Sequence, residues 1–276
     1  MSKSAPRVEA LVRRWNLSIE DTRITKNSVV AFGKRGKDSV VLKVLRQTGD
    51  EWFSGRVLHA FNGNGVARVY EFTEGAVLLE RLIPGNPARD LVLAGLDSEA
   101  TRILADVIQK MSASECPNIV TAEEWARGFD RYLASGDRTI PADLVNEARG
   151  IYLELCASQQ ERRLLHGDLH HENVLFDHRR GWLAIDPKGV LGETAFEVSA
   201  ALLNPIGHPE FVTPAAVRRR IDIFHAALNI DLTRILRWAF SRSVLSAVWS
   251  WEDNEPDETL RHALLLARTT RDILNL

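Results

Sequence analysis

Residues 166–176 read HGDLHHENVLF and place three histidines and three carboxylate or amide side chains ahead of a short apolar run. Such a group could bind a metal ion, or it could form the catalytic loop of an enzyme that transfers phosphate. His166 and His170 are four residues apart and would share one face of a helix. However, Gly167 directly after the first histidine argues against a helix, and HHENVL lacks the second histidine of the HExxH zinc motif. A zinc site is therefore the weaker interpretation.

The next residues, 173–186, read NVLFDHRRGWLAID and predict a β-hairpin, because two short apolar strands flank the turn-forming DHRRG. If the turn is centred between Arg179 and Arg180, Asn173 and Asp186 lie opposite each other at the open end of the hairpin. Cross-strand Cα atoms are there about 4.5–5.5 Å apart. An amide oxygen and a carboxylate would then face a common point. Both suit Mg²⁺, which often takes only one or two protein ligands and completes its shell with water and phosphates.

Asp168 lies five residues before Asn173, the D-x4-N spacing by which kinase catalytic loops set a base beside metal-bound phosphates. In that role it would orient the acceptor hydroxyl and accept its proton. If Asp168 were only a turn cap, its spacing to Asn173 and Asp186 would be a coincidence. We expect His166 to hold the loop. We expect no chemical role for the remaining histidines of this region, His170, His171 and His178.

The first third of the chain predicts a small antiparallel sheet with one helix. Two β-branched runs in residues 27–45 surround the turn-forming GKRGKD, and residues 65–72 and 76–82 are two further strand candidates. Between them, residues 50–61 have helical spacing. Because side chains alternate along a strand, Lys43 points to the face opposite its apolar neighbours. It is then either a functional lysine or a surface lysine on a strand.

Residues 83–90, IPGNPARD, mark the predicted domain boundary, because proline and glycine interrupt any regular element there. We divide the chain into an N-terminal domain, 1–84, and a C-terminal domain, 85–276. The second domain is expected to be largely helical. Helix-start signals are found at Asp97, at the capping box of residues 121–124, and at Thr213, which precedes a proline.

The composition excludes several classes of protein. The chain has 276 residues, 45% of them hydrophobic, and a formal net charge of -2 without a basic patch, so nucleic acid is an unexpected partner. Cys116 and Cys156 match no metal-binding or redox spacing and fit a reducing compartment. No signal peptide or membrane-spanning run is found. We therefore expect a soluble cytoplasmic protein without nucleic-acid or membrane partners, as a monomer or weak dimer.

The motifs HGDLHHENVL and IDPKG together resemble the aminoglycoside phosphotransferase family, whose fold is similar to that of protein kinases. GWLAIDPKGVLGE and SVLSAVWSWED are most similar to its streptomycin 6-phosphotransferase and hydroxyurea-type members. The resemblance covers nearly the whole chain and implies an α+β, bilobal, protein-kinase-like fold. A small antiparallel N-lobe with one helix would precede a mostly α-helical C-lobe. The glycine-rich GxGxxG loop of protein kinases is missing, and only FGKRGKDS stands in its place.

The resemblance also implies how the cofactors, ATP and Mg²⁺, are bound. Lys43 would contact the α- and β-phosphates and pair with Glu51, with Asp50 as the alternative carboxylate. LLERL at 78–82 has the form of the hinge between lobes. The backbone carbonyl of Glu80 and the N–H of Leu82 would meet the adenine edge there, although the same residues would also serve as a plain strand end.

Acceptor contacts are expected from the helical region. The candidates are Trp249, Trp251, Glu252, Asp253, Glu193 and Glu197. The two tryptophans are two residues apart on a helix and cannot share one face, so only one of them is expected to line the site. The carboxylates near residue 253 could equally form a solvated loop. Glu193 and Glu197 could equally be first-turn carboxylates that the helix dipole favours.

These observations favour an ATP-dependent small-molecule kinase that phosphorylates a hydroxyl of streptomycin or a similar cationic aminocyclitol. One alternative keeps the kinase and changes the acceptor to hydroxyurea, another antibiotic or a metabolite. A second alternative is a nucleotide-binding regulator without catalysis. It is disfavoured because Lys43, Asp168, Asn173 and Asp186 are all present.

Overall fold

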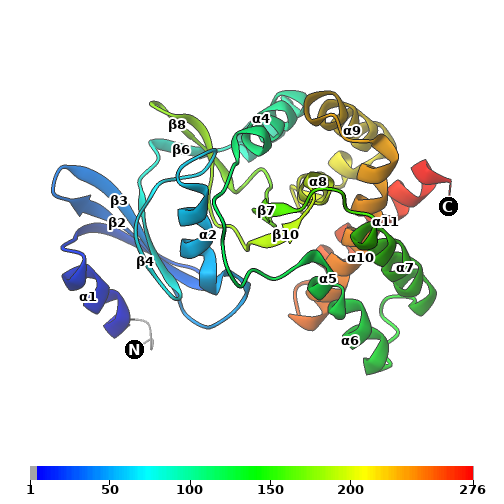
Figure 1. Ribbon diagram of the computed structural model, residues 1–276, viewed down its shortest axis with the longest axis horizontal. Helices are drawn as coiled ribbons and strands as arrows, with labels where there is room; N and C mark the ends of the chain where they lie inside the picture. Colours follow the sequence, from blue (N-terminus) through cyan, green and yellow to red (C-terminus); the bar gives the residue numbers. More distant parts are fainter. Residues whose placement is uncertain (1–4, 276) are drawn as a thin grey trace.

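The computed structural model describes residues 5–275, which form two lobes joined at one side (Figure 1). The N-lobe contains an antiparallel sheet with a helix on each face. The C-lobe is mostly helical and carries two small sheets beside the junction. This is the bilobal, protein-kinase-like α+β fold that the sequence predicts.

The N-lobe sheet has five strands in the order β1-β2-β3-β5-β4, all antiparallel to their neighbours. The strands are β1 (Ser18–Ile24), β2 (Ser28–Arg35), β3 (Asp38–Leu45), β4 (Val69–Thr73) and β5 (Ala76–Glu80). The hairpin predicted in residues 27–45 is confirmed as β2 and β3. The sequence analysis missed β1, together with α1 (Ala5–Arg14), which precedes it.

Strand β3 is buried on both faces, and its successive side chains point alternately to the apolar outer face and to the face of the site. Leu42 and Val44 face outward into an apolar cluster with Leu11 and Trp15, which lie in α1 and just after it. Lys43 lies between them in sequence and therefore points to the opposite face, toward the C-lobe. The first helix thus covers the outer face of the sheet and leaves the inner face for the site.

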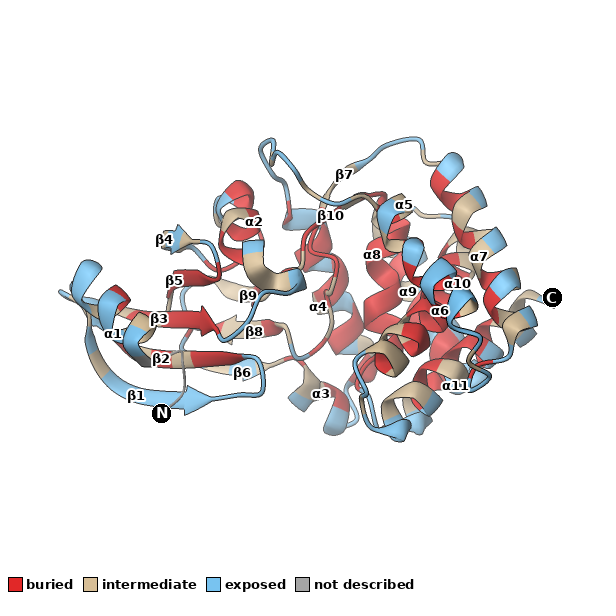
Figure 2. Ribbon diagram, turned by 90° about the horizontal axis from the view of Figure 1, so that it is seen from below, coloured by how far each residue is buried: buried red, intermediate tan, exposed pale blue. Residues whose placement is uncertain are grey.

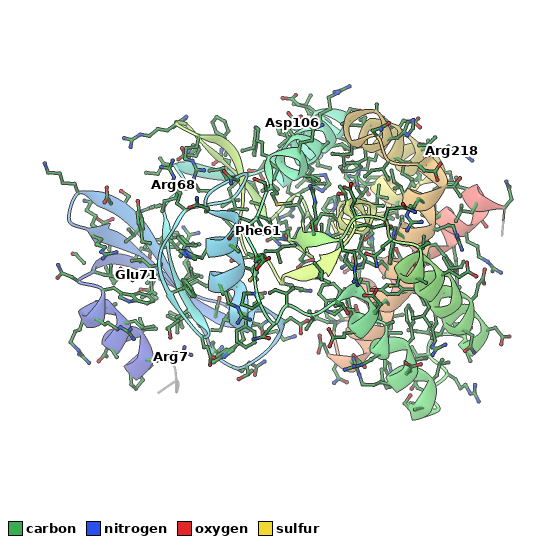
Figure 3. The ribbon with its side chains drawn as sticks, viewed as in Figure 1. Arg7, Phe61, Arg68, Glu71, Asp106 and Arg218 are labelled. Atoms are coloured by element: carbon green, nitrogen blue, oxygen red, sulfur yellow. The ribbon has the colours of Figure 1, made fainter. Side chains whose placement is uncertain are left out.

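The 3₁₀ turn η1 (Asp50–Phe53) and helix α2 (Ser54–Phe61) share this inner face with the site and cover part of it. Gly55 permits close packing, because a Cβ at this position would lie 2.7 Å from the Cβ of Phe72 on β4. Phe61 is fully buried at the end of α2, between the sheet and the C-lobe (Figure 3). One hydrophobic cluster includes residues of α2, β5 and the C-lobe helices, so both lobes share part of their core.

The chain enters the C-lobe directly after β5. Strand β6 (Pro84–Pro87) pairs with β8 (Val174–Asp177), which in turn pairs with β9 (Gly181–Ala184). A second pair joins β7 (Arg163–Leu165) to β10 (Val190–Gly192). We keep the boundary near residue 84 as a proposal.

Helices make up the rest of the C-lobe. They are α3 (Arg89–Leu93), α4 (Asp97–Lys110), α5 (Ala122–Trp125), α6 (Arg127–Ser135), α7 (Ala142–Ala157), α8 (Thr194–Leu203), α9 (Pro214–Leu228), α10 (Leu232–Glu252) and α11 (Asp257–Leu274), with the 3₁₀ turn η2 (Pro209–Val212). Helices α8 and α10 are mostly buried, whereas β1 of the N-lobe is mostly exposed (Figure 2). The C-lobe is thus a helical core with the small sheets at its edge.

All three predicted helix starts are confirmed, although one of the three residues does not cap its helix. The Thr121 side chain caps the N–H of Glu124, and the Glu124 carboxylate accepts from the N–H of Thr121, as a capping box requires. Thr213 caps α9 through the N–H of Ala216. Asp97 is not a cap: it is the first residue of α4, and its carboxylate pairs with arginines of α9. No helix in residues 5–275 is long and apolar enough to span a membrane.

Candidate active site

The loop between β7 and β8 carries the histidine and aspartate of the HGD motif. Gly167 has a φ of +81°, a conformation that glycine adopts without strain, and a Cβ there would lie 3.2 Å from the side chains of Trp125 and Val190. The buried His166 ring is 2.7 Å from the carbonyl of Ile185 through Nε2, and its Nδ1 is 3.2 Å from the N–H of Asp168. His166 therefore links the loop to the strand that leads to Asp186. The sequence analysis expected this structural role for His166.

Glu197 supports the same loop from below and is not an acceptor contact. Its fully buried carboxylate accepts hydrogen bonds from the N–H groups of His166, at 2.7 Å, and Gly167, at 3.0 Å. Glu193 is also directed inward, where it accepts from Arg234 at 2.7 Å and from the indole N–H of Trp238. The expectation that these carboxylates bind the acceptor is corrected, because both are occupied by protein donors.

The hairpin predicted after the loop is present, but its register is shifted by one residue. Asp177 pairs with Gly181, which centres the turn on Arg179, so Asn173 lies opposite Ile185 and not Asp186. The Asp177 carboxylate causes this tighter turn, because its Oδ1 accepts from the N–H groups of Arg179 and Arg180, each at 2.9 Å.

Asp186 follows the end of β9 and has a φ of +58°. Asn173 uses its amide nitrogen to donate to the Asp168 carbonyl at 3.0 Å, which leaves the amide oxygen for a ligand. In residues 5–275 no group of three or more His, Cys, Asp or Glu could hold a metal ion. An amide and a carboxylate fit Mg²⁺, which needs few protein ligands when phosphates supply the rest.

Lys43 joins the N-lobe to this site. Its ammonium group is 2.5 Å from Glu51 Oε2, in the 3₁₀ turn η1, and 3.0 Å from Asp186 Oδ1. Burial alone would lower the pKa of Lys43, but the charges of Asp186 and Glu51 raise it, so the ammonium stays protonated. Glu51 is thus the carboxylate that pairs with Lys43. Asp50, the alternative, faces the neighbouring cleft.

Asp168 is held as a carboxylate by the cations around it. Burial alone would raise its pKa, but Lys188, whose Nζ is 3.5 Å from Asp168 Oδ2, and the more distant Arg242 are among the groups that lower it well below its usual range. The Nε2 atom of His170 is 4.0 Å from the same oxygen. Asp168 is therefore available to accept a proton.

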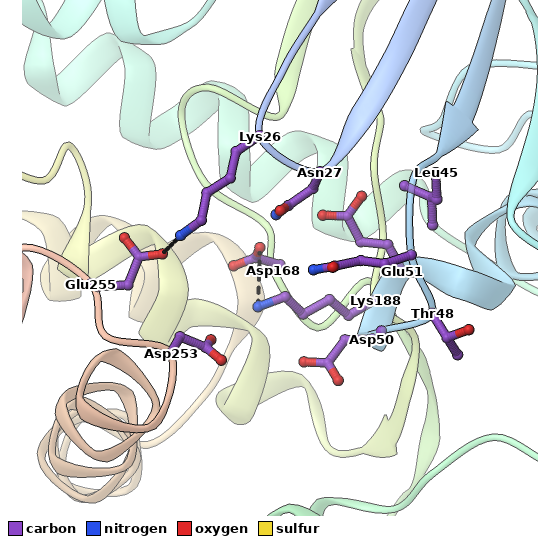
Figure 4. Close-up of a pocket in the computed structure, with 12 residues that line it drawn as sticks. Lys26, Asn27, Leu45, Thr48, Asp50, Glu51, Asp168, Lys188, Asp253 and Glu255 are labelled. Carbon is purple, nitrogen blue, oxygen red and sulfur yellow. Dashed lines mark hydrogen bonds and ion pairs between the residues drawn. The ribbon is translucent and has the colours of Figure 1, made fainter. Parts of the chain in front are cut away.

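A cleft of about 410 Å³ opens between the lobes above Asp168 (Figure 4). The charged residues that line it are Lys26, Asp50, Glu51, Asp168, Lys188, Asp253 and Glu255. Carboxylates outnumber lysines, so the cleft favours a cationic molecule. At its mouth, Lys26 of the N-lobe pairs with Glu255 of the C-lobe at 2.9 Å.

The structure separates the four candidate acceptor contacts near residue 250. Asp253 lines the cleft, and Trp249 lines a small cavity of about 50 Å³ that also touches Asp168. Trp251 instead packs against Tyr132 of α6, with ring centroids 4.9 Å apart. Glu252 forms a two-point ion pair with Arg131 of α6, at 2.7 and 2.9 Å. Trp251 and Glu252 therefore stabilise the helix packing, and we no longer propose them as acceptor contacts.

The predicted hinge residues Glu80 and Leu82 lie at and just after the end of β5, and neither lines the interlobe cleft. The Glu80 side chain is paired with Arg180, so only its backbone is a candidate for base contacts. Within residues 5–275, the N–H of Leu82 donates to no protein acceptor, whereas the N–H of Ile83 donates to Asp177 at 3.0 Å. Leu82 is buried in a small apolar cluster with Ala67 and Leu183, with Leu175 and Ile185 packed against it.

Two residues of the site were not identified from the sequence. Lys188 is the lysine of IDPKG, two residues after Asp186, and that proximity was the available signal. Arg242 is buried in α10, where its guanidinium donates to the Gly167 carbonyl at 3.2 Å and lies over the Phe196 ring. An arginine that is the one charged residue in the stretch 238–251 was the signal for this residue.

The sequence is similar to known phosphotransferases. The family described as aminoglycoside/hydroxyurea antibiotic resistance kinase matches residues 14–254. The chain is 34% identical to a streptomycin 3''-kinase of Klebsiella pneumoniae over 86% of this chain and 90% of that protein. It is 29% identical to a hydroxyurea phosphotransferase of Kitasatospora aureofaciens, over 90% and 74%. It is also 29% identical to a streptomycin 6-kinase of Streptomyces glaucescens, over 89% and 82%.

Solved structures share the fold at lower identity. A thermostable mutant of an aminoglycoside phosphotransferase, in ternary complex with ADP and hygromycin B, matches with a TM-score of 0.69 at 17% identity over 98% of both chains. A choline kinase of Streptococcus pneumoniae matches with a TM-score of 0.67 at 13% identity, over 97% of this chain and 100% of that one. The chain belongs to the aminoglycoside/hydroxyurea antibiotic resistance kinase family and is a phosphotransferase that acts on an alcohol group.

Proposed function

We propose that the protein transfers the γ-phosphate of ATP to a hydroxyl group of streptomycin or a closely similar cationic aminocyclitol. The observation that carries this proposal is the position of Asp168 at the floor of an interlobe cleft whose lining has more carboxylates than lysines. The guanidinium groups of streptomycin stay protonated at neutral pH and pair well with carboxylates.

The residues have separate roles in this reaction. Lys43, held by Glu51, contacts the α- and β-phosphates of ATP, while the backbone of Glu80 and Leu82 receives the adenine. Asp168 orients the acceptor hydroxyl and accepts its proton, which suits a loose transition state that needs mainly positioning and charge stabilisation.

Asn173 and Asp186 would hold Mg²⁺, which neutralises charge on the β- and γ-phosphates when it is bound. Asp186 would then have two tasks, because one of its oxygens already pairs with Lys43. The other oxygen and the amide oxygen of Asn173 are the two ligands that this chain offers. The shared carboxylate would couple the metal to the lysine that binds the nucleotide.

On the acceptor side, we propose Asp253 and Trp249 as contacts and add Glu255, which lines the cleft and whose solvent-exposed pair with Lys26 a cationic acceptor could replace. The relatives phosphorylate different positions, since one is named a 3''-kinase and another a 6-kinase. We therefore propose the acceptor class and leave the hydroxyl open.

A panel of acceptors tests the proposal. Purified protein is incubated with magnesium and γ-labelled ATP, and label transfer to streptomycin, hygromycin B, hydroxyurea and choline is measured at steady state. We expect the highest kcat/KM with streptomycin. Transfer to hydroxyurea or another neutral acceptor in its place would keep the kinase and overturn the cationic acceptor. Nucleotide binding without transfer to any acceptor would favour the regulator.

A further inference from the structure

We propose that Lys188 is a second catalytic residue: its ammonium group holds the Asp168 carboxylate before the reaction and contacts the transferring phosphoryl group during it. This inference rests on the proposed kinase function. Lys188 is the cation nearest to Asp168 in the described structure, with Nζ 3.5 Å from Oδ2 (Figure 4).

The backbone fixes Lys188 to the loop that carries Asp168. The N–H groups of Lys188 and Gly189 both donate to the carbonyl of His166, at 3.0 and 2.9 Å. The chain segments that carry the two charged residues are therefore joined directly by backbone hydrogen bonds. Such fixed placement is what a group aimed at a transition state requires.

The side chain of Lys188 borders both cavities next to Asp168. It lines the interlobe cleft and also the small cavity beneath it, which Asp168 lines as well. Its ammonium lies 5.7 Å from the centroid of the Trp249 ring, within the range of a cation–π contact. With an exposed fraction of 24%, the side chain can still meet a ligand.

The two other lysines near the site are engaged elsewhere. Lys43 pairs with Glu51 and Asp186, and Lys26 pairs with Glu255 at the mouth of the cleft. Lys188 differs from them because its partner, Asp168, loses its negative charge in the reaction.

In the proposed transfer step one bond forms and one bond breaks. The acceptor oxygen forms a bond to the γ-phosphorus, and the bond from that phosphorus to the bridging oxygen breaks. The electron pair of the broken bond leaves with ADP, and the acceptor proton moves to the Asp168 carboxylate. Lys188 takes no part in the proton transfer. As Asp168 becomes neutral, its attraction for the ammonium falls, and Lys188 is released to the phosphoryl oxygens.

Binding of a phosphoryl mimic tests this role without an acceptor. Calorimetry gives the Kd of ADP with magnesium, and of ADP with magnesium and aluminium fluoride, a mimic of the transferring phosphoryl group. We expect Lys188→Met to weaken the aluminium fluoride complex about tenfold or more, the value of one charge-assisted hydrogen bond. The Kd of ADP alone should stay near wild type. Lys188→Arg should restore most of the affinity, and Lys110→Met, at an exposed site on α4, should have no effect.

The same measurement in an Asp168→Asn background separates a catalytic lysine from a positioning one. If Lys188 contacts the phosphoryl group, Lys188→Met weakens the mimic in this background too. If Lys188 acts only through Asp168, the additional substitution has no effect and the proposal is overturned. It is also overturned if wild type binds the mimic no more tightly than ADP. A weakened mimic in a protein that phosphorylates no acceptor would support Lys188 while rejecting the proposed substrate.

Discussion

Two clusters of charged residues in the C-lobe differ in how completely their charges are matched. In the first, Asp97 of α4 accepts from Arg220 at 2.6 and 2.9 Å and from Arg219 at 2.8 Å. Arg220, fully buried, also donates to the carbonyls of Ala201 and Asn204. Burial alone would raise the pKa of Asp97, but the arginines lower it. No oxygen of Asp97 is left for a ligand.

The second cluster lines the interlobe cleft and is incomplete. Lys188 and Asp168 are 3.5 Å apart, longer than a hydrogen bond, and Asp253 faces the opening. The same residue types thus have two different roles in the two clusters. Where protein donors match every charge, the cluster stabilises the fold, and where the carboxylates are in excess and face a cavity, they are available for a ligand.

The largest expected effect is at the metal site proposed for Asn173 and Asp186. Asp186→Ala should abolish magnesium-dependent ATP binding, because Asn173 alone would hold the metal poorly. Calorimetry with and without magnesium measures this. If both proteins bound ATP equally well in the presence and absence of magnesium, the assignment of Asn173 and Asp186 to a metal would be wrong.

A substitution in the first cluster, around Asp97, should change the stability of the fold. Asp97→Asn leaves a buried arginine charge uncompensated and should lower the free energy of unfolding by about 3–5 kcal/mol. The kcat of the folded protein should stay near wild type. The control is Asp106→Asn on the same helix, where the side chain is at the surface (Figure 3). Urea unfolding that showed the same midpoint for both variants would contradict the contrast between the clusters.

A smaller effect is expected for the ion pair between Glu51 and Lys43, the lysine proposed to contact the nucleotide. Glu51→Gln removes one charge of the Lys43 pair and should lower kcat/KM for ATP by about tenfold. The neighbouring Asp50→Asn should change it little, because Asp50 does not contact Lys43 in the structure. Equal losses in the two variants would mean that the general charge of the cleft matters, and not the pair.

How well the sequence predicted a feature of this molecule depended on how far apart in the sequence its interacting residues lie. The β2–β3 hairpin, the face of Lys43 and the capping box at Thr121 follow from local patterns, and all three are found. Strand β1 was missed because its sequence, SIEDTRI, is mostly polar and exposed, without apolar alternation. The hairpin register was off by one because the side chain of Asp177 tightens the turn.

The candidate acceptor residues show more clearly what could not be predicted from the sequence. Glu197 is directed to a loop 30 residues earlier in the chain, and Glu252 to an arginine 121 residues away. A carboxylate in a sequence does not reveal whether a distant donor will neutralise it. The motif residues were easier to identify because Asp168 and Asn173 lie on one short loop.

The smallest effect concerns the acceptor. Asp253→Asn combined with Glu255→Gln should raise the acceptor KM and leave the ATP KM and kcat unchanged, each contact contributing about 0.2–1 kcal/mol. Glu252→Gln is the matched control, since its partner is Arg131. The wild-type acceptor KM should also rise with ionic strength, because exposed charges are screened beyond about 8 Å at physiological salt. An unchanged KM and salt dependence in the double variant would make this segment a solvated loop.

The most direct test of the central claim is the turnover of Asp168→Asn beside wild type, with streptomycin and magnesium ATP. In the proposed mechanism Asp168 accepts the hydroxyl proton and orients the acceptor, so its loss should lower kcat roughly 100-fold or more. The affinity for ATP and the free energy of unfolding should stay near wild type. A variant that retained most of the wild-type turnover would contradict the assignment of Asp168 as the base and, with it, the proposed site of phosphate transfer.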